Sequence, residues 1–183
     1  MTTEATFLNL EQCLQDLQEG LEMLGTTIEQ DRPECGDVIV ASRMTDAVLA
    51  ARGYLRGVIT SAREARGAVT GSLDPVLARL ALTRSQEQFH RFANFFHTEL
   101  HCFDRFDDLR NIGEERGRPW RDWATVVTET LGQGERIVEE TRAAFLSSWK
   151  ALAERMIAVP VTVQTASVPS WIQIPSRAGR HAV

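Results

Sequence analysis

The segment Gln86–Asp108, QEQFHRFANFFHTELHCFDRFDD, carries six of the chain's eight phenylalanines and three of its four histidines. An α-helix turns about 100° per residue. On that wheel the apolar residues gather on one face, which consists of Phe89, Phe92, Phe96, Leu100 and Phe103, widened by Phe95, Cys102 and Phe106. This i, i+3, i+4, i+7 spacing indicates a helix with one buried side. Because burying one phenylalanine contributes about 1.5–3 kcal/mol, this helix is predicted to supply much of the hydrophobic core.

A second strip on the same predicted helix is polar and consists of His90, His97, His101 and Asp104. It lies about 110–140° from the centre of the apolar face and therefore leans toward solvent. His97 and His101, at i and i+4, could both reach one transition-metal ion, and Asp104 could add an oxygen ligand. The alternative is a row of half-exposed histidines outside the core. The segment lacks both the paired Glu-x-x-His of di-iron bundles and the His-Glu-x-x-His of zincins, so no cofactor is predicted.

The bulk composition is that of an ordinary globular chain of 183 residues, with 43% hydrophobic and 25% charged residues. The net charge of −5 makes nucleic-acid binding an unlikely role, because that role needs dense Lys and Arg. No apolar run approaches the length of a membrane span, and no signal peptide is visible. Cys13, Cys35 and Cys102 are widely spaced and form no even framework, which predicts free thiols and a cytoplasmic location.

The first predicted helix, from about Thr6 to Glu29, has apolar residues in alternating steps of three and four. They are Phe7, Leu10, Leu14, Leu17, Leu21, Leu24 and Ile28. Such an a/d pattern over three heptads suits packing inside a bundle and equally suits pairing with a second copy. Leu10, Leu14, Leu17 and Leu21 are therefore candidate interaction residues, and both alternatives stay open at this stage.

Three further helices are predicted, each from its boundary signals. Asp37 is a good N-cap for the second helix, which ends near Gly67. The apolar face predicted for this helix consists of Val40, Met44, Ala47, Ala51, Tyr54, Val58 and Ala62. Asp74 and Pro75 open the third, in which Val76, Leu77, Leu80 and Leu82 lead into the aromatic segment. Pro119 opens the fourth. Its apolar stripe keeps its phase from Trp123 to Met156, which predicts a continuous helix across Gly132 and Gly134.

The chain is thus expected to divide into an all-α domain, residues 1–157, and a short C-terminal tail, residues 158–183. In the tail, Val161 and Val163 alternate with polar residues, and Trp171 and Ile172 form a second β-like stretch between prolines. Two short strands are not stable alone in water. The tail strands are therefore predicted to dock on the bundle, on another subunit or on a partner, and Trp171 is either a groove anchor or folded back onto the bundle.

Two Arg and His pairs, Arg84 with His90 and Arg91 with His97, fit the spacing Arg-x(4–6)-His. This resembles the motif of HEPN-type ribonucleases, which are also helical. The resemblance implies an arginine that stabilises charge on a scissile phosphate and a histidine that transfers a proton, usually across a dimer. Ser85 supplies the polar residue expected beside the arginine in the first pair, whereas Phe92 occupies that place in the second. The alternative is surface Arg and His engaged in salt bridges.

These patterns predict an antiparallel, up-down four-helix bundle with long helices and a β-like tail. The function expected from it is non-catalytic: an interaction or assembly subunit that self-associates or docks into a larger cytoplasmic complex, for example by adding a tail strand to a partner's sheet. The alternative function is a HEPN-like ribonuclease or a metal-binding bundle that uses His90, His97 and His101.

Overall fold

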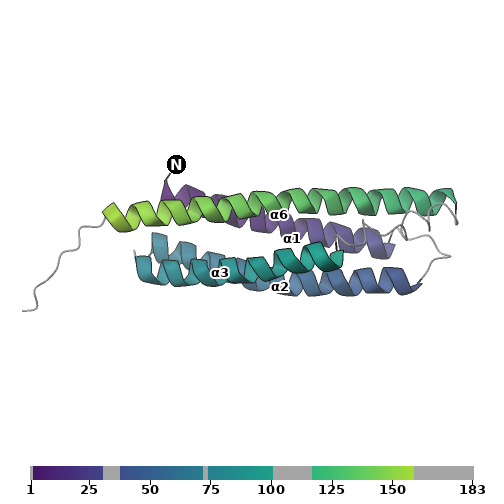
Figure 1. Ribbon diagram of the computed structural model, residues 1–183, viewed down its shortest axis with the longest axis horizontal. Helices are drawn as coiled ribbons and strands as arrows, with labels where there is room; N and C mark the ends of the chain where they lie inside the picture. Colours follow the sequence, from purple (N-terminus) through teal and green to yellow (C-terminus); the bar gives the residue numbers. More distant parts are fainter. Residues whose placement is uncertain (1, 31–37, 72–73, 101–116, 159–183) are drawn as a thin grey trace, which may run out of the picture.

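The computed structural model describes residues 2–30, 38–71, 74–100 and 117–158. Its helices are α1 (Thr3–Gln30), α2 (Val38–Thr70), α3 (Pro75–Phe95), a short π-helix η1 (Phe96–Leu100) that continues α3, and α6 (Arg118–Ala158). Successive helices run in opposite directions along the bundle, with α1 packed against α6 and α2 packed against α3 (Figure 1). The predicted antiparallel four-helix bundle is confirmed, and the described residues contain no strand.

Helix α1 contributes one continuous face to the core through its heptad positions, which we call the α1 seam. They are Phe7, Leu10, Leu14, Leu17, Leu21, Leu24 and Ile28, each at most 3% exposed. The steps of three and four keep all seven side chains on one face over the full length of the helix. Of the two alternatives predicted for this seam, packing inside the bundle is therefore the one observed.

Helix α6 is continuous across Gly132 and Gly134, as the phase of its stripe predicted. Two hydrogen bonds fix it to α1 near opposite ends of their contact. The indole Nε1 of Trp123 donates to the carbonyl oxygen of Thr27 at 3.1 Å, and the hydroxyl of Ser148 donates to the carbonyl oxygen of Thr6 at 3.3 Å. Both donors are buried, so each bond satisfies a group that would otherwise be costly to bury.

Helices α2 and α3 pair closely through small and polar residues. The buried Ser85 hydroxyl donates to the carbonyl oxygen of Val58 at 3.0 Å, and Gln88 lies against Gly57. Helix α2 extends to Thr70, beyond the predicted end near Gly67, because Gly67 continues as an ordinary helical residue. Four predicted residues of the α2 face, Met44, Ala51, Val58 and Ala62, are buried, and the stripe also includes Leu55. Ala47 is only partly buried, and Tyr54 is 45% exposed because it lies at the edge of this stripe, where its ring packs beside that of Phe95 at 5.3 Å between centroids. The side chain of Val40 lies outside the described residues.

The first turn of α3 is capped as predicted, and three apolar residues near it are exposed to solvent. Asp74 is the N-cap, and its Oδ1 accepts hydrogen bonds from the backbone N–H groups of Val76 at 2.9 Å and Leu77 at 3.0 Å. Val76, Leu77 and Leu80, which lead into the aromatic segment, are 61%, 54% and 61% exposed, whereas Leu82 is buried. These three residues lie about 100–180° around the helix from Phe89 and Phe96, so they do not share the buried face.

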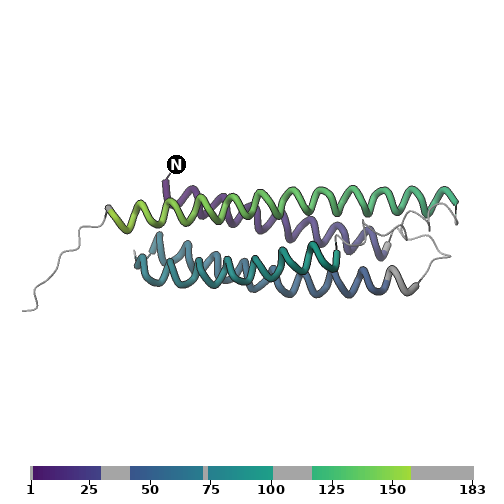
Figure 2. The backbone as a smooth tube through the Cα atoms, in the orientation of Figure 1, coloured from purple at the N-terminus to yellow at the C-terminus, as the bar shows by residue number. Residues whose placement is uncertain are grey.

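The aromatic segment is buried as predicted in its described part, with Phe89, Phe92 and Phe96 at most 2% exposed. Its backbone is not a uniform α-helix, since η1 widens the turn from Phe96 to Leu100. Helix α3 and η1 stop well before the end of the bundle that α1, α2 and α6 reach (Figure 2). The predictions for Phe103 and Phe106 lie outside the described residues.

Candidate functional site

The polar strip predicted on the aromatic helix is only partly described. His90 is exposed and His97 is half-buried, with its ring perpendicular to that of Phe96 at 6.0 Å between centroids. His101 and Asp104 lie outside the described residues, so the predicted pairing of His97 with His101 stays a prediction. Within residues 2–30, 38–71, 74–100 and 117–158, no three His, Cys, Asp or Glu side chains are placed to hold a metal ion.

The Arg and His pairs that resemble the HEPN motif do not converge within one chain. Arg84 and His90 are six residues apart, which separates them by about 120° around α3 and about 9 Å along it. The side chain of Arg84 is 65% exposed and forms a surface ion pair with Glu64 of α2 at 3.7 Å. Arg91 and His97 are also six residues apart, with His97 in η1. Joint action on one phosphate, which the resemblance implies across a dimer, stays a prediction.

The interaction residues predicted on α1 lie inside the molecule. Leu10, Leu14, Leu17 and Leu21 are 0%, 0%, 2% and 3% exposed. They contact the other helices of the same bundle and present no surface to a second protein while the bundle is folded. The candidate residues of the tail, Val161, Val163, Trp171 and Ile172, lie outside the described residues.

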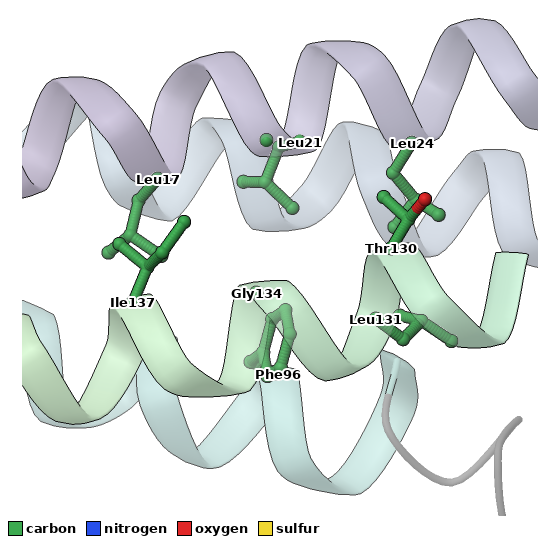
Figure 3. A pocket seen from close by; sticks show the side chains of 9 residues that line it. Leu17, Leu21, Leu24, Phe96, Thr130, Leu131, Gly134 and Ile137 are labelled. Carbon is green, nitrogen blue, oxygen red and sulfur yellow. The ribbon is translucent and has the colours of Figure 1, made fainter. Parts of the chain in front are cut away.

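The interior has one described junction of interest, where α1, α6 and η1 meet around Gly134. The ring of Phe96 lies over Gly134, and Leu17, Leu21, Leu24, Leu131 and Ile137 complete an apolar lining (Figure 3). The free space there is about 10 Å³, which is too little to accommodate one water molecule securely, let alone a substrate. A Cβ atom on Gly134 would come within 2.8 Å of Phe96 Cζ, so the glycine is required by this ring.

Sequence reasoning missed an exposed apolar cluster at the start of α3, which consists of Val76, Leu77 and Leu80 and which we call the α3 patch. Val76 and Leu80 are i and i+4, and Leu77 and Leu80 are i and i+3, so the three side chains are neighbours on the helix surface. All three are more than half exposed on the side of α3 opposite the core. The angular position of these three residues around the helix relative to Phe89 is the sequence signal that could have predicted their exposure.

A polar groove runs between α1 and α2 as two adjoining hollows of about 290 and 210 Å³. Its α1 wall is acidic and amide-rich, and its α2 wall is basic: the lining includes Glu11, Gln15, Gln18, Glu19, Glu22, Arg52, Arg56, Ile59 and Arg63. Two ion pairs cross it, Arg66 with Glu11 at 2.8 Å and Arg52 with Glu22 at 3.3 Å. The groove therefore separates two walls of opposite charge.

The thiol of Cys13 on α1 is a poor candidate nucleophile. Its burial raises the pKa above the ordinary value for a thiol, and the carboxylates of Asp16 and Glu140 raise the pKa further. The reactive thiolate is consequently less populated at neutral pH than for an exposed cysteine.

No protein-family model matches the chain, and comparisons with curated proteins and with solved structures find no match either. None of the described helices combines the length and the apolar character needed to cross a membrane.

Proposed function

We propose that the chain is a non-catalytic interaction or assembly subunit that associates with copies of itself or joins a larger cytoplasmic complex. The observation that carries this proposal is the α3 patch. A folded chain gains nothing from holding three neighbouring aliphatic side chains in water, since about 25 cal/mol is available per Å² of apolar surface buried. Single exposed apolar residues are common on proteins, but a contiguous group is typical of an interaction surface.

The architecture of the interior supports the same proposal. The described part of the core is filled mainly by aliphatic and aromatic side chains, and three of its polar groups, those of Ser85, Ser148 and Trp123, donate to backbone carbonyl oxygens of neighbouring helices. Such bonds hold helices in register and leave those groups committed to structure. Contacts with partners are therefore assigned to the surface of the bundle.

The α3 patch is tested by the double substitution Leu77→Gln with Leu80→Gln, which keeps helix propensity and removes the apolar surface. A matched control is Val126→Gln with Leu146→Gln on α6, two residues that are 47% and 64% exposed and lie far apart along the helix. Size-exclusion chromatography with light scattering and pull-down from the protein's own cell extract would be compared. We expect the patch variant alone to lose its association, at an unchanged unfolding midpoint. Full retention of every association by the patch variant contradicts the assignment.

The tail provides a separate test of the same function. We expect a chain that ends after Ala158 to keep its helical circular dichroism and to lose the partners that bind through Val161, Val163, Trp171 or Ile172. An unchanged set of partners after this truncation removes the tail from the proposal and leaves the α3 patch to be judged by its own variants.

A further inference from the structure

The first two helices of the chain, α1 and α2, pack against each other and carry opposite net charges. Helix α1 holds six carboxylates and no Lys or Arg, whereas α2 holds five arginines and two carboxylates. The acidic and basic walls meet along the polar groove, so the side of the bundle formed by α1 and α2 is acidic on one half and basic on the other. We call it the α1–α2 side.

The basic half, formed by α2, has no carboxylate among the arginines that face the groove. Arg52, Arg56, Arg63 and Arg66 all lie along the groove or pair across it. The two carboxylates of α2, Asp46 and Glu64, are 18 residues apart and so share one helical phase. Glu64 faces α3, where it lies 3.7 Å from Arg84, and therefore points away from α1.

Only part of this charge is neutralised within the chain. Glu11 pairs with Arg66 and Glu22 pairs with Arg52. Among the described residues Glu19, Arg56 and Arg63 form no ion pair, although all three line the groove. The two pairs that do form show the register of the antiparallel helices, and in this register Glu19 of α1 lies at the same height along the bundle as Arg56 of α2.

We infer that the α1–α2 side binds the same side of a second copy in a two-fold dimer, with α1 of each copy against α2 of the other. A two-fold axis parallel to the bundle places the acidic half of one copy on the basic half of its partner. Rotation about this axis leaves the height of each residue along the bundle unchanged, so Glu19 of each copy meets Arg56 of the other. A self-complementary patch of this kind is what an isologous interface requires. The inference rests on the proposed function and names the partner and the surface.

The dimensions of this side suit a dimer of moderate size. A helix of 28 residues is about 42 Å long, and two helices side by side are about 20 Å wide, which gives on the order of 800 Å² per partner. The contact is rich in exposed charges, each of which contributes little by itself. The dimer is therefore expected to be concentration-dependent and salt-sensitive. Binding of a nucleic acid to the same arginines is disfavoured because the adjoining α1 half would repel phosphates.

The experiment is a charge exchange between Glu19 and Arg56, followed by sedimentation velocity of the full chain over a range of concentrations. We expect the wild type to dimerise near 0.1 M salt and to dissociate near 1 M, where the Debye length falls from about 10 to about 3 Å. Glu19→Arg or Arg56→Glu alone should weaken the dimer by at least about tenfold, because like charges then meet twice. The two single variants mixed together, and the double variant Glu19→Arg with Arg56→Glu, should dimerise again.

Several outcomes overturn the inference. The inference is wrong if the wild type stays monomeric at every concentration. It is also wrong if the single variants dimerise as well as the wild type, or if the mixture of the two single variants stays monomeric. Binding of a fluorescent single-stranded DNA that Arg56→Glu abolishes, with no dimer formed, would assign the surface to nucleic acid instead. If the charge variants change nothing while Leu77→Gln with Leu80→Gln removes an association, the dimer inference fails and the proposed function stands.

Discussion

The aliphatic residues of α1 and those at the start of α3 have opposite environments in the same bundle. Leu14 and Leu17 in the α1 seam are at most 2% exposed, while Leu77 and Leu80 in the α3 patch are 54% and 61% exposed. All four residues are leucines within helices, so hydrophobicity alone does not explain why two are buried and two are exposed. The difference is one of helical phase: the seam keeps to one face for seven positions, and the patch falls opposite the aromatic face that its own helix buries.

This difference teaches where the bundle uses apolar surface for stability and where it leaves such surface for contact with other molecules. The α1 seam is surrounded by the other helices and has no surface to offer. The α3 patch contributes nothing to the core, and its three side chains form one cluster that is accessible from outside. Truncating a leucine should therefore destabilise the fold in the α1 seam and leave its stability nearly unchanged in the α3 patch.

The largest expected effect is the contrast between Leu14→Ala and Leu80→Ala. Leu14→Ala should lower the free energy of unfolding by about 2–5 kcal/mol, because it leaves a cavity in a close-packed core. Leu80→Ala should change it by no more than about 0.5 kcal/mol, since the side chain is already in water. Urea denaturation followed by circular dichroism measures both. Equal losses for the two variants would mean that the α3 patch is buried in solution.

The fold could be predicted from the sequence because its main determinants are local. The α1 seam repeats in regular steps, Asp74 and Pro75 mark a helix start, and the stripe of α6 keeps its phase across Gly132 and Gly134. The contact between the Phe96 ring and Gly134 could not be predicted, because the two residues are nearly forty positions apart in sequence and no local pattern links them. Helical phase on α3 was available, and applying it to Val76, Leu77 and Leu80 would have placed them outside.

The candidate surfaces were less predictable than the fold. The charge contrast between α1 and α2 is visible in their composition, but which carboxylate is left without an ion pair depends on the register of the two helices. The same holds for Arg84 and His90, whose spacing fits a motif while their phase separates them. Sequence reasoning found residue types with useful chemistry, and packing decides which of them share a face.

The second prediction concerns the junction where the aromatic helix closes against α6. Gly134→Ala should lower the free energy of unfolding by about 1–3 kcal/mol, because the new methyl group would overlap the Phe96 ring, 2.8 Å away. Gly132→Ala, two residues earlier, meets no atom within 4 Å and should instead raise stability by about 0.5–1 kcal/mol.

A double-mutant cycle with Phe96→Leu sharpens this prediction. If the ring is what excludes a Cβ, the cost of Gly134→Ala should be much smaller in the Phe96→Leu background than in the wild type. Additive costs in the cycle would show that Gly134 is required for a reason other than the ring.

The third prediction addresses the turn that presents the α3 patch. Asp74→Ala should lower the free energy of unfolding by about 1 kcal/mol, because the N–H groups of Val76 and Leu77 lose their acceptor. Asp74→Asn is the matched control and should retain most of the stability, since asparagine caps helices about as well. Thermal unfolding measures both variants. A full loss in the asparagine variant would point to the charge of Asp74 and away from its hydrogen bonds.

The smallest effect is expected at Gly20, which lies on α1 beside the buried leucines. Gly20→Ala should raise the free energy of unfolding by about 0.4–1 kcal/mol, because alanine restricts the unfolded chain and its Cβ meets nothing within 4 Å. Gly117 is the contrasting position: its φ of 91° is strained for any residue with a Cβ, so Gly117→Ala should lower stability by about 1–2 kcal/mol. Chemical denaturation of the two variants tests the signs together. A loss at Gly20 would show that α1 needs the glycine for close approach of another surface, which is the one result that would extend the contact region of α1 beyond its acidic face.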